Sequence, residues 1–353
     1  MYYVNEHIKE CIRIFPEQGR GEFIRLDMNE NPEGLPLDFV NSVLDEITPS
    51  FLATYPEPKN FMEKYANALN VSIDNVCCVN GSDMGIRYIF DVFTHPGGEA
   101  VMVSPTFGMY GVNAKQHGVI VKSVQYDDNL TVSAEKIVDS ITDNTNLVIL
   151  LNPNNPVGNV FTNEECNLII EKARLCNAVV VIDEAYHYFC PETFLDFVQK
   201  YDNVLLLRTF SKLFSLAAVR LGVIIGNESI IRYVQNARLS FDVNSIALKF
   251  GERLLDSPGI KDDLIQIHRQ GKEYLIDRLK SNDIHFFAGK GNFLFVEPTI
   301  PAPQMVEELY KRKILVKYYE HPLLNRYIRV TTASQRMMSL FWNAFEDIQI
   351  TNR

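Results

Sequence analysis

The chain has 353 residues, a length that predicts two domains or one large lobe with a smaller one attached. Apolar residues make up 46% and charged residues 22%, which excludes a disordered or fibrous chain. The formal net charge is −10 and there is no basic block, so we expect no nucleic-acid partner. The sequence contains neither an apolar run of about 18 residues nor a signal-peptide pattern, so we expect no membrane span. Six cysteines without a CxxC pair indicate reduced thiols in a cytoplasmic protein, and the histidine spacing predicts no metal site.

The first two thirds of the chain alternate short apolar runs with amphipathic segments. The apolar runs predict strands at 76–79, 100–104, 119–124, 146–151, 178–183, 203–209 and 221–226. Helices are predicted over 82–94, after Pro105 and over 163–176, and residues 211–220 look like a turn from a loop into a helix. Because the strands are almost continuously apolar, we expect a largely parallel sheet that helices cover on both faces.

Beyond about residue 235 the pattern changes to long helical stretches and short strand candidates. Helices are predicted at 227–240, 245–256, 260–281 and 334–347, and strands near 284–287, 292–296, 314–316 and 327–331. We therefore predict the α/β class, with a large α/β domain over 30–235 that holds a mostly parallel seven-stranded sheet. Residues 1–29 and 236–353 are predicted to form a smaller α+β domain.

Two segments at predicted strand ends carry candidate catalytic groups. Lys212 lies among apolar neighbours, with Arg220 eight residues on. A lone lysine is usually a surface group, but a desolvated one near a second cation has a lowered pKa and can form Schiff bases. Asp183 ends a predicted strand, where it could cap a helix or face a protonated ring nitrogen, and Tyr186 could bond a ring hydroxyl.

Two further strand-end segments supply amides and a candidate anion site. NPNNPVG at 152–158 is a tight loop that contains Asn155, and NGSDMG at 80–85 contains Ser82 and Asp83 at a helix start. The free N–H groups of a helix start bind anions, although both residues are also ordinary capping residues. A lysine, a carboxylate, a phenol with amides and an anion cradle together fit pyridoxal phosphate.

The chain resembles the fold-type I pyridoxal-phosphate aminotransferases, and among them most closely the histidinol-phosphate aminotransferases. Eight motifs carry the resemblance in order: RLDMNENPEG at 25–34, YPEP at 55–58, NGSDMGI at 80–86, SPTFGMY at 104–110, NPNNPVG at 152–158, VIDEAYHYF at 181–189, RTFSKLFSLAAVRLG at 208–222 and RYIRVTTAS at 326–334. The resemblance implies the aspartate-aminotransferase-like fold, in which a large lobe carries the cofactor.

The same resemblance implies a role for each matched residue around the cofactor. Lys212 is the Schiff-base lysine and moves the proton, and Asp183 pairs with the pyridinium nitrogen. Tyr186 and Asn155 bond the ring oxygen, and Phe107 stacks on the ring. The cofactor phosphate is held by backbone groups of Ser82 and Asp83, by Thr209 or Ser211, by Arg220, and by Tyr55 of the other subunit of a homodimer with shared active sites.

The family also implies a substrate region and a reaction. Arg329 binds the carboxylate of an amino-acid donor, expected to be L-glutamate, and Lys317 and Asn31 belong to the substrate site. The amino group then passes to a phosphorylated ketone in two successive half-reactions of ping-pong type.

Some positions depart from the histidinol-phosphate pattern. Lys317 stands where the family usually has an arginine, and lysine lacks the two-pronged guanidinium. The segment 13–22 has Phe15 and no tyrosine for a substrate phosphate, and Arg20 either replaces it or is a loop charge. These changes leave two alternatives open: an aminotransferase for a smaller ketone such as dihydroxyacetone phosphate, and a decarboxylase of the threonine-phosphate type.

Overall fold

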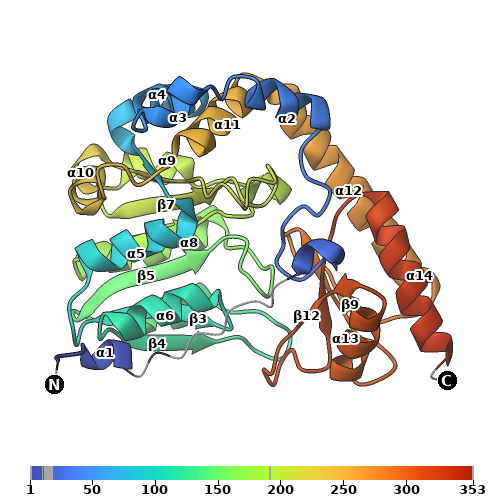
Figure 1. Cartoon of the computed structure of the whole chain (residues 1–353). Coiled ribbons are helices and arrows are strands. Elements are labelled where there is room, and N and C mark those ends of the chain that lie inside the picture. Colours follow the sequence, from blue (N-terminus) through green and yellow to red (C-terminus); the bar gives the residue numbers. More distant parts are fainter. Residues whose placement is uncertain (1, 10, 12–18, 191, 352–353) are drawn as a thin grey trace.

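The structure, a computed structural model, describes residues 2–9, 11, 19–190 and 192–351. Its largest element is a seven-stranded sheet (Figure 1). In spatial order the strands are β2 (Val76–Val79), β8 (Gly222–Gly226), β7 (Val204–Thr209), β6 (Val179–Asp183), β5 (Thr145–Leu151), β3 (Glu99–Ser104) and β4 (Ile120–Gln125). Only β8 runs against the others, so the predicted α/β class with a mostly parallel sheet is confirmed.

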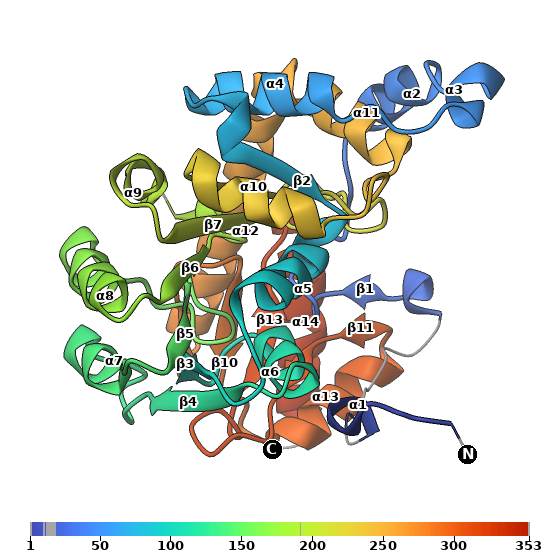
Figure 2. The same ribbon diagram turned by 90° about the vertical axis from the view of Figure 1, so that its left-hand side faces the viewer.

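Successive residues of the central strands enter two separate cores, one on each face of the sheet. In β5, Val148 and Leu150 belong to one buried cluster, while Leu147 and Ile149 belong to the other. The first cluster includes residues of α7 (Ala134–Ser140), α8 (Asn163–Leu175) and α9 (Leu195–Lys200), and the second those of α5 (Gly81–Phe93), α6 (Gly108–Gln116) and α10 (Glu228–Ala237). Figure 2 shows these two sets of helices on opposite sides of the strands.

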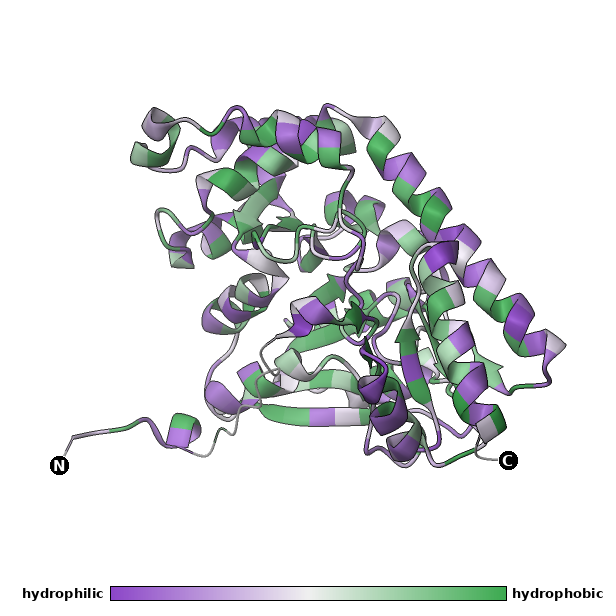
Figure 3. Ribbon diagram, turned by 45° about the vertical axis from the view of Figure 1, so that its right-hand side comes forward, coloured by the Kyte–Doolittle hydropathy of each residue, from purple (hydrophilic) through white to green (hydrophobic). Residues whose placement is uncertain are grey.

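The edge strand β4 does not fit the expectation of strands buried on both faces. Five of its six residues are not buried, and Lys122 and Ser123 interrupt its apolar sequence. Figure 3 shows hydrophilic colour in the middle of this outermost strand. The reason is its position at the sheet edge, because among the described strands β4 pairs with β3 alone.

The predicted turn into a helix at residues 211–220 is wrong. This segment consists of turns that join β7 to β8, and the two strands are antiparallel neighbours. Thr209 and Gly222 are paired across these strands, so residues 210–221 bring the chain back beside the end of β7, and they do so through turns. Ser215 and Arg220 both adopt left-handed backbone conformations, with φ of 57° and 60°.

The rest of the chain surrounds a smaller antiparallel sheet. Its strands, in spatial order, are β12 (Lys317–Tyr318), β13 (Ile328–Thr331), β10 (Phe293–Val296) and β9 (Phe286–Phe287), and β1 (Ile24–Arg25) pairs in parallel with β11 (Ile314–Leu315). The strand β12 was not predicted. The described residues include no helix with the length and apolar character needed to cross a membrane.

The remaining helices connect and flank the two sheets (Figure 1). They are α1 (Glu6–Lys9), α2 (Leu37–Leu44), α3 (Pro49–Ala53), α4 (Lys59–Leu69), α11 (Ser245–Leu255), α12 (Pro258–Ser281), α13 (Ala302–Lys311) and α14 (Gln335–Thr351). The helix α12 packs along α14 beside the smaller sheet, while α11 packs on α4 beside the large sheet. The domain boundary near residue 235 stays a prediction.

Candidate active site

The loops at one edge of the large sheet enclose a cavity of about 170 Å³. This edge holds the carboxyl ends of the parallel strands, and the antiparallel β8 begins there, which brings Arg220 to the same place. Ten predicted cofactor-binding residues line the cavity: Ser82, Asp83, Phe107, Asn155, Asp183, Tyr186, Thr209, Ser211, Lys212 and Arg220. Sequence reasoning missed five other lining residues: Met28, Glu30, Leu151, Ala185 and Ala217.

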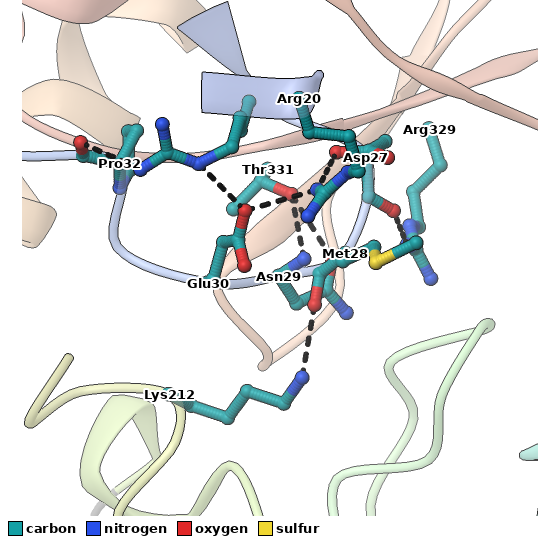
Figure 4. Close-up of polar contacts among 10 residues, drawn as sticks. Arg20, Asp27, Met28, Asn29, Glu30, Pro32, Lys212, Arg329 and Thr331 are labelled. Carbon is teal, nitrogen blue, oxygen red and sulfur yellow. Dashed lines mark hydrogen bonds and ion pairs between the residues drawn. The ribbon is translucent and has the colours of Figure 1, made fainter. Parts of the chain in front are cut away.

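Lys212 projects from the loop after β7 toward the N-terminal segment of the chain. Its Nζ donates a hydrogen bond to the carbonyl oxygen of Met28 at 2.9 Å (Figure 4). Burial, and after it the positive charge of Arg329, lowers the pKa of Lys212 from 10.5 to about 8. A substantial fraction of the amine is therefore neutral at mildly alkaline pH, the form in which lysine acts as a nucleophile.

Asp183 is a buried carboxylate with two hydrogen-bond donors. The hydroxyl of Tyr110 donates to Oδ2 at 2.8 Å, and the backbone N–H of Ala185 donates to Oδ1 at 3.0 Å. Burial raises the pKa of Asp183 from 3.8 to about 6, although these two hydrogen bonds act in the opposite direction. Tyr110 was not predicted, although it ends the SPTFGMY motif at 104–110, three residues after Phe107.

The hydroxyl of Tyr186 is the meeting point of two asparagine side chains. Asn155 and Asn29 each donate an Nδ2–H bond to this oxygen at 3.0 Å. The Oδ1 of Asn155 in turn accepts a hydrogen bond from Arg329 at 2.7 Å. Asn29 was not predicted, because its contact with Tyr186 joins residues 157 positions apart.

Arg220 and the start of α5 form a close-fitting corner of the cavity. The guanidinium of Arg220 lies 3.1 Å from Asp83 and donates to Ser211 at 3.3 Å. Gly81 has φ of +71°, and a Cβ there would lie 2.3 Å from Nη2 of Arg220. A Cβ on Gly222 would lie 2.6 Å from the backbone nitrogen of Ser82. Both glycines are therefore needed for a cation and a helix N-terminus to meet here.

Arg329 lies on β13 with 3% of its surface exposed, between the rings of Phe293 and Tyr319. Besides Asn155, its guanidinium bonds the Tyr319 hydroxyl and the Asp27 carbonyl oxygen. Within the described residues Arg329 forms no ion pair, and its buried Nε has no hydrogen-bond partner. A buried cation without a carboxylate partner is costly unless an anion joins it.

Tyr55 and Asn31, like Arg329 and Lys317, are predicted site residues that do not line the cavity. Tyr55 is 72% exposed and stacks on Phe241, with ring centroids 4.3 Å apart. Asn31 uses its amide to bond the hydroxyl of Ser215 at 2.8 Å, so it fixes the loop that follows Lys212. Their predicted roles at the phosphate and the substrate stay predictions.

The two remaining cations of the predicted substrate region differ in their surroundings. Lys317 is exposed on β12 and is paired in register with Arg329. Arg20 instead contacts Asp27 at 2.7 Å and Glu30 at 2.9 Å, which favours the interpretation as a loop charge. Phe15 lies outside the described residues.

Comparisons with known proteins show the family to which the chain belongs. A family model described as "Aminotransferase class I and II" matches residues 22–340, and the chain belongs to this family of pyridoxal-phosphate enzymes. More narrowly, it resembles the histidinol-phosphate aminotransferases. That of Methanocaldococcus jannaschii is 32% identical over 97% of this chain and 92% of its own length, and that of Clostridium novyi is 31% identical over 94% of each.

Solved structures show the same fold. The histidinol-phosphate aminotransferase of Sinorhizobium meliloti in complex with pyridoxal-5′-phosphate superposes with a TM-score of 0.89 at 20% identity, over 100% of this chain and 99% of that one. A variant of the aspartate aminotransferase of Thermus thermophilus gives 0.80 at 17% identity, over 98% and 99%. The predicted aspartate-aminotransferase-like fold and the predicted pyridoxal-phosphate-dependent aminotransferase are thus confirmed.

The cavity residues fit this cofactor chemically. An aldehyde needs an amine, which Lys212 supplies, and a protonated ring nitrogen needs a buried carboxylate such as Asp183. A ring oxygen needs a donor such as the Tyr186 hydroxyl. A phosphate needs a cation beside a helix start, and the two glycines hold Arg220 in that place.

Proposed function

We propose that this aminotransferase moves an amino group from L-glutamate to a phosphorylated ketone of the imidazole-acetol phosphate type, in two half-reactions. The observation that carries the proposal is the buried guanidinium of Arg329, which has no carboxylate partner among the described residues and lies near the lysine of the site. An α-carboxylate supplies the missing anion. Relatives with about 30% identity over nearly the whole chain support the acceptor class.

We propose that the cavity residues hold the cofactor as the resemblance implies. Pyridoxal phosphate supplies an aldehyde that takes up amino groups and a ring that stores electrons. Lys212 would hold the aldehyde carbon and, when free, move the proton at the substrate Cα. Asp183 would keep a proton on the ring nitrogen. Phe107 would stack on the ring and Tyr186 and Asn155 would bond its oxygen, while the phosphate would contact Ser82, Asp83, Thr209, Ser211 and Arg220.

The donor site is supported by the way Arg329 is held. Its Nη atoms bond Tyr319, Asn155 and the Asp27 carbonyl, and the two flanking rings exclude water from its faces. A carboxylate that approaches this fork replaces no strong ion pair, so its charge-assisted bonds of about 1.5–3 kcal/mol each contribute to binding.

The acceptor phosphate is proposed to lie farther out, near Lys317. Lys317 and Arg329 are directly opposite each other in an antiparallel strand pair, so their side chains lie on the same face of the smaller sheet. Nζ of Lys317 is 6.0 Å from the ring of Tyr319, whose hydroxyl bonds Arg329. The two neighbouring cations match the two substrates. In the first half-reaction Arg329 would bind the carboxylate of the donor, and in the second Lys317 would bind the phosphate of the acceptor.

We also propose a homodimer in which Tyr55 reaches the phosphate in the partner's cavity. Support comes from the exposed apolar surface around it: Leu52 is 64% exposed, Phe241 is 53% exposed and Leu239 is 67% exposed. Tyr55 is held by its stack on Phe241 rather than by its own cavity, which leaves its hydroxyl for another chain.

A half-reaction screen tests the acceptor. The enzyme is first converted by L-glutamate, which changes the visible absorption band, and candidate ketones are then added to restore it. Imidazole-acetol phosphate should restore the band faster than dihydroxyacetone phosphate. The reverse order overturns the imidazole assignment, and carbon dioxide release without a keto-acid product overturns transamination itself.

Matched variants separate the two anion sites. Arg329→Leu should weaken the glutamate half-reaction, because the substrate carboxylate loses the guanidinium that binds it. Lys317→Gln should weaken only the ketone half-reaction, by about tenfold for one charge-assisted bond. Lys311→Gln removes an exposed lysine that pairs with Glu307 and serves as the control. An equal effect of the Lys311 and Lys317 variants would refute the phosphate assignment.

A further inference from the structure

Three consecutive residues of the N-terminal segment each contact one side chain of the site, and Figure 4 shows the contacts of the first two, Asp27 and Met28. The Asp27 carbonyl accepts from Arg329, the Met28 carbonyl accepts from Lys212, and the Asn29 side chain donates to Tyr186. Only the last of these three contacts uses a side chain from the segment, so a substitution can change it without altering the others.

Asn29 is held firmly from the side of the smaller sheet. It is 1% exposed and has a left-handed backbone with φ of 57°. Its backbone N–H donates to Oγ1 of Thr331 at 3.0 Å, and its carbonyl oxygen accepts from Asn292 at 3.1 Å. The Thr331 hydroxyl donates in turn to Oδ1 of Asn29 at 3.2 Å. With Oδ1 accepting from Thr331, the other end of the amide, Nδ2, faces Tyr186.

The same reasoning fixes the amide of Asn155. Its Oδ1 accepts from the guanidinium of Arg329, which can only donate, so its Nδ2 is the end that faces Tyr186. The phenolic oxygen of Tyr186 thus receives two N–H bonds and has no lone pair left. Its own proton must go to a third partner, and the described residues offer no acceptor for it. Because Tyr186 lines the cavity, that proton points into the cavity.

We propose that Asn29 is a positioning residue that, together with Asn155, commits the Tyr186 proton to the bound cofactor. The inference rests on the proposed function, in which the ring oxygen of the cofactor faces Tyr186. Two donors on the phenolic oxygen polarise its O–H and strengthen the bond that it donates. The stronger bond stabilises negative charge on the ring oxygen and so sets the pH at which the bound cofactor changes its visible absorption.

Two substitutions change the donor in different ways. Asn29→Asp replaces Nδ2 with a carboxylate oxygen, which accepts the Tyr186 proton and withdraws it from the cavity. Asn29→Gly removes the donor and keeps a residue that adopts positive φ without strain, so it tests the idea without a new charge. Asn177, an exposed asparagine with φ of 56°, gives the matched control variants Asn177→Asp and Asn177→Gly.

The measurement is the pH midpoint of the visible band of the holoenzyme, in the wild-type and Tyr186→Phe backgrounds. We expect Asn29→Asp to raise the midpoint by about one unit, a tenfold change in proton affinity, and Asn29→Gly to raise it by less. In the Tyr186→Phe background Asn29→Gly should have no effect, and the shift from Asn29→Asp should shrink to what its charge alone produces. The Asn177 variants should behave as wild type.

The outcomes separate this inference from the proposed function. Shifts of the same size with and without the Tyr186 hydroxyl, or no shift from either Asn29 variant, overturn the role of Asn29. A midpoint that does not respond to Tyr186→Phe alone overturns the proposed placement of Tyr186 at the ring oxygen. The acceptor ketone plays no part in either result.

Discussion

The hydroxyl of Tyr110 offers the sharpest test of how this site keeps its buried carboxylate charged. The ring of Tyr110 is fully buried in the core below the sheet edge, and its hydroxyl donates to Oδ2 of Asp183 at 2.8 Å. Tyr110→Phe removes this one donor and leaves the apolar packing of the ring in place. The second donor to the carboxylate, the backbone N–H of Ala185, remains.

The expected magnitude follows from the energy of such a bond. A hydrogen bond to a charged group contributes about 1.5–3 kcal/mol, and one pKa unit corresponds to about 1.4 kcal/mol. The pKa of Asp183, raised by burial to about 6, should therefore rise further by about one to two units in the variant. At pH 7 the ionised fraction falls from about 90% to between about 10% and 50%. A protonated Asp183 cannot hold a proton on the ring nitrogen. As the pH is lowered, the variant should therefore lose its affinity for the cofactor at a higher pH than the wild type does.

The assay is a titration of the apo-protein with pyridoxal phosphate between pH 5.5 and 8.5, followed by visible absorbance. The midpoint of the affinity profile should move upward in Tyr110→Phe. Tyr201→Phe is the control, because that buried hydroxyl also contacts a carboxylate, Glu171 at 2.9 Å, but lies away from the cavity. A midpoint that stays in place or moves downward would refute the reasoning.

Three further predictions concern the stability of the fold and the proposed phosphate site at Arg220. The pKa of Lys212 is lowered from 10.5 to about 8 in the folded protein, so the unfolded chain binds the proton more tightly. In urea unfolding of the apo-protein, the free energy of unfolding should therefore rise by up to about 3 kcal/mol between pH 8 and 10.5. Lys212→Met should lack this rise. Glu184→Gln removes the carboxylate from a fully buried ion pair with an arginine and should lower the free energy of unfolding by about 3–5 kcal/mol, and a loss below about 1 kcal/mol would contradict a buried pair. Gly81→Ala places a Cβ 2.3 Å from Arg220 and should weaken cofactor binding at least tenfold, whereas Gly97→Ala, also at positive φ but with nothing within 4 Å, should not.

The parts of the fold and site that the sequence predicts are marked by patterns within short stretches of the sequence. Continuous apolar runs of four or five residues are enough to mark the inner strands, because such strands are buried on both faces. Once the strands are placed, topology brings the residues at their ends to one edge, which is why the order of residues along the chain is enough to group Asp183, Lys212 and Asn155. The edge strand β4 shares the apolar pattern only in part and differs in its burial.

The residues that could not be predicted act through contacts between distant segments. Asn29 meets Tyr186, and Met28 meets Lys212, only because the N-terminal segment crosses from the smaller sheet to the large one. Tyr110 looks like any core aromatic until its hydroxyl is seen at a carboxylate. The loop after Lys212 has helix-forming residues, and only the antiparallel pairing of β8 with β7 shows why it turns instead.

The central claim is a covalent bond between Lys212 and the aldehyde of pyridoxal phosphate, and borohydride reduction tests it most directly. After reduction of the holoenzyme and proteolysis, mass spectrometry should find the reduced adduct on the peptide that contains Lys212, and reduced Lys212→Ala protein should carry none. An adduct on another lysine of the wild-type protein, or no adduct at all, would contradict the account.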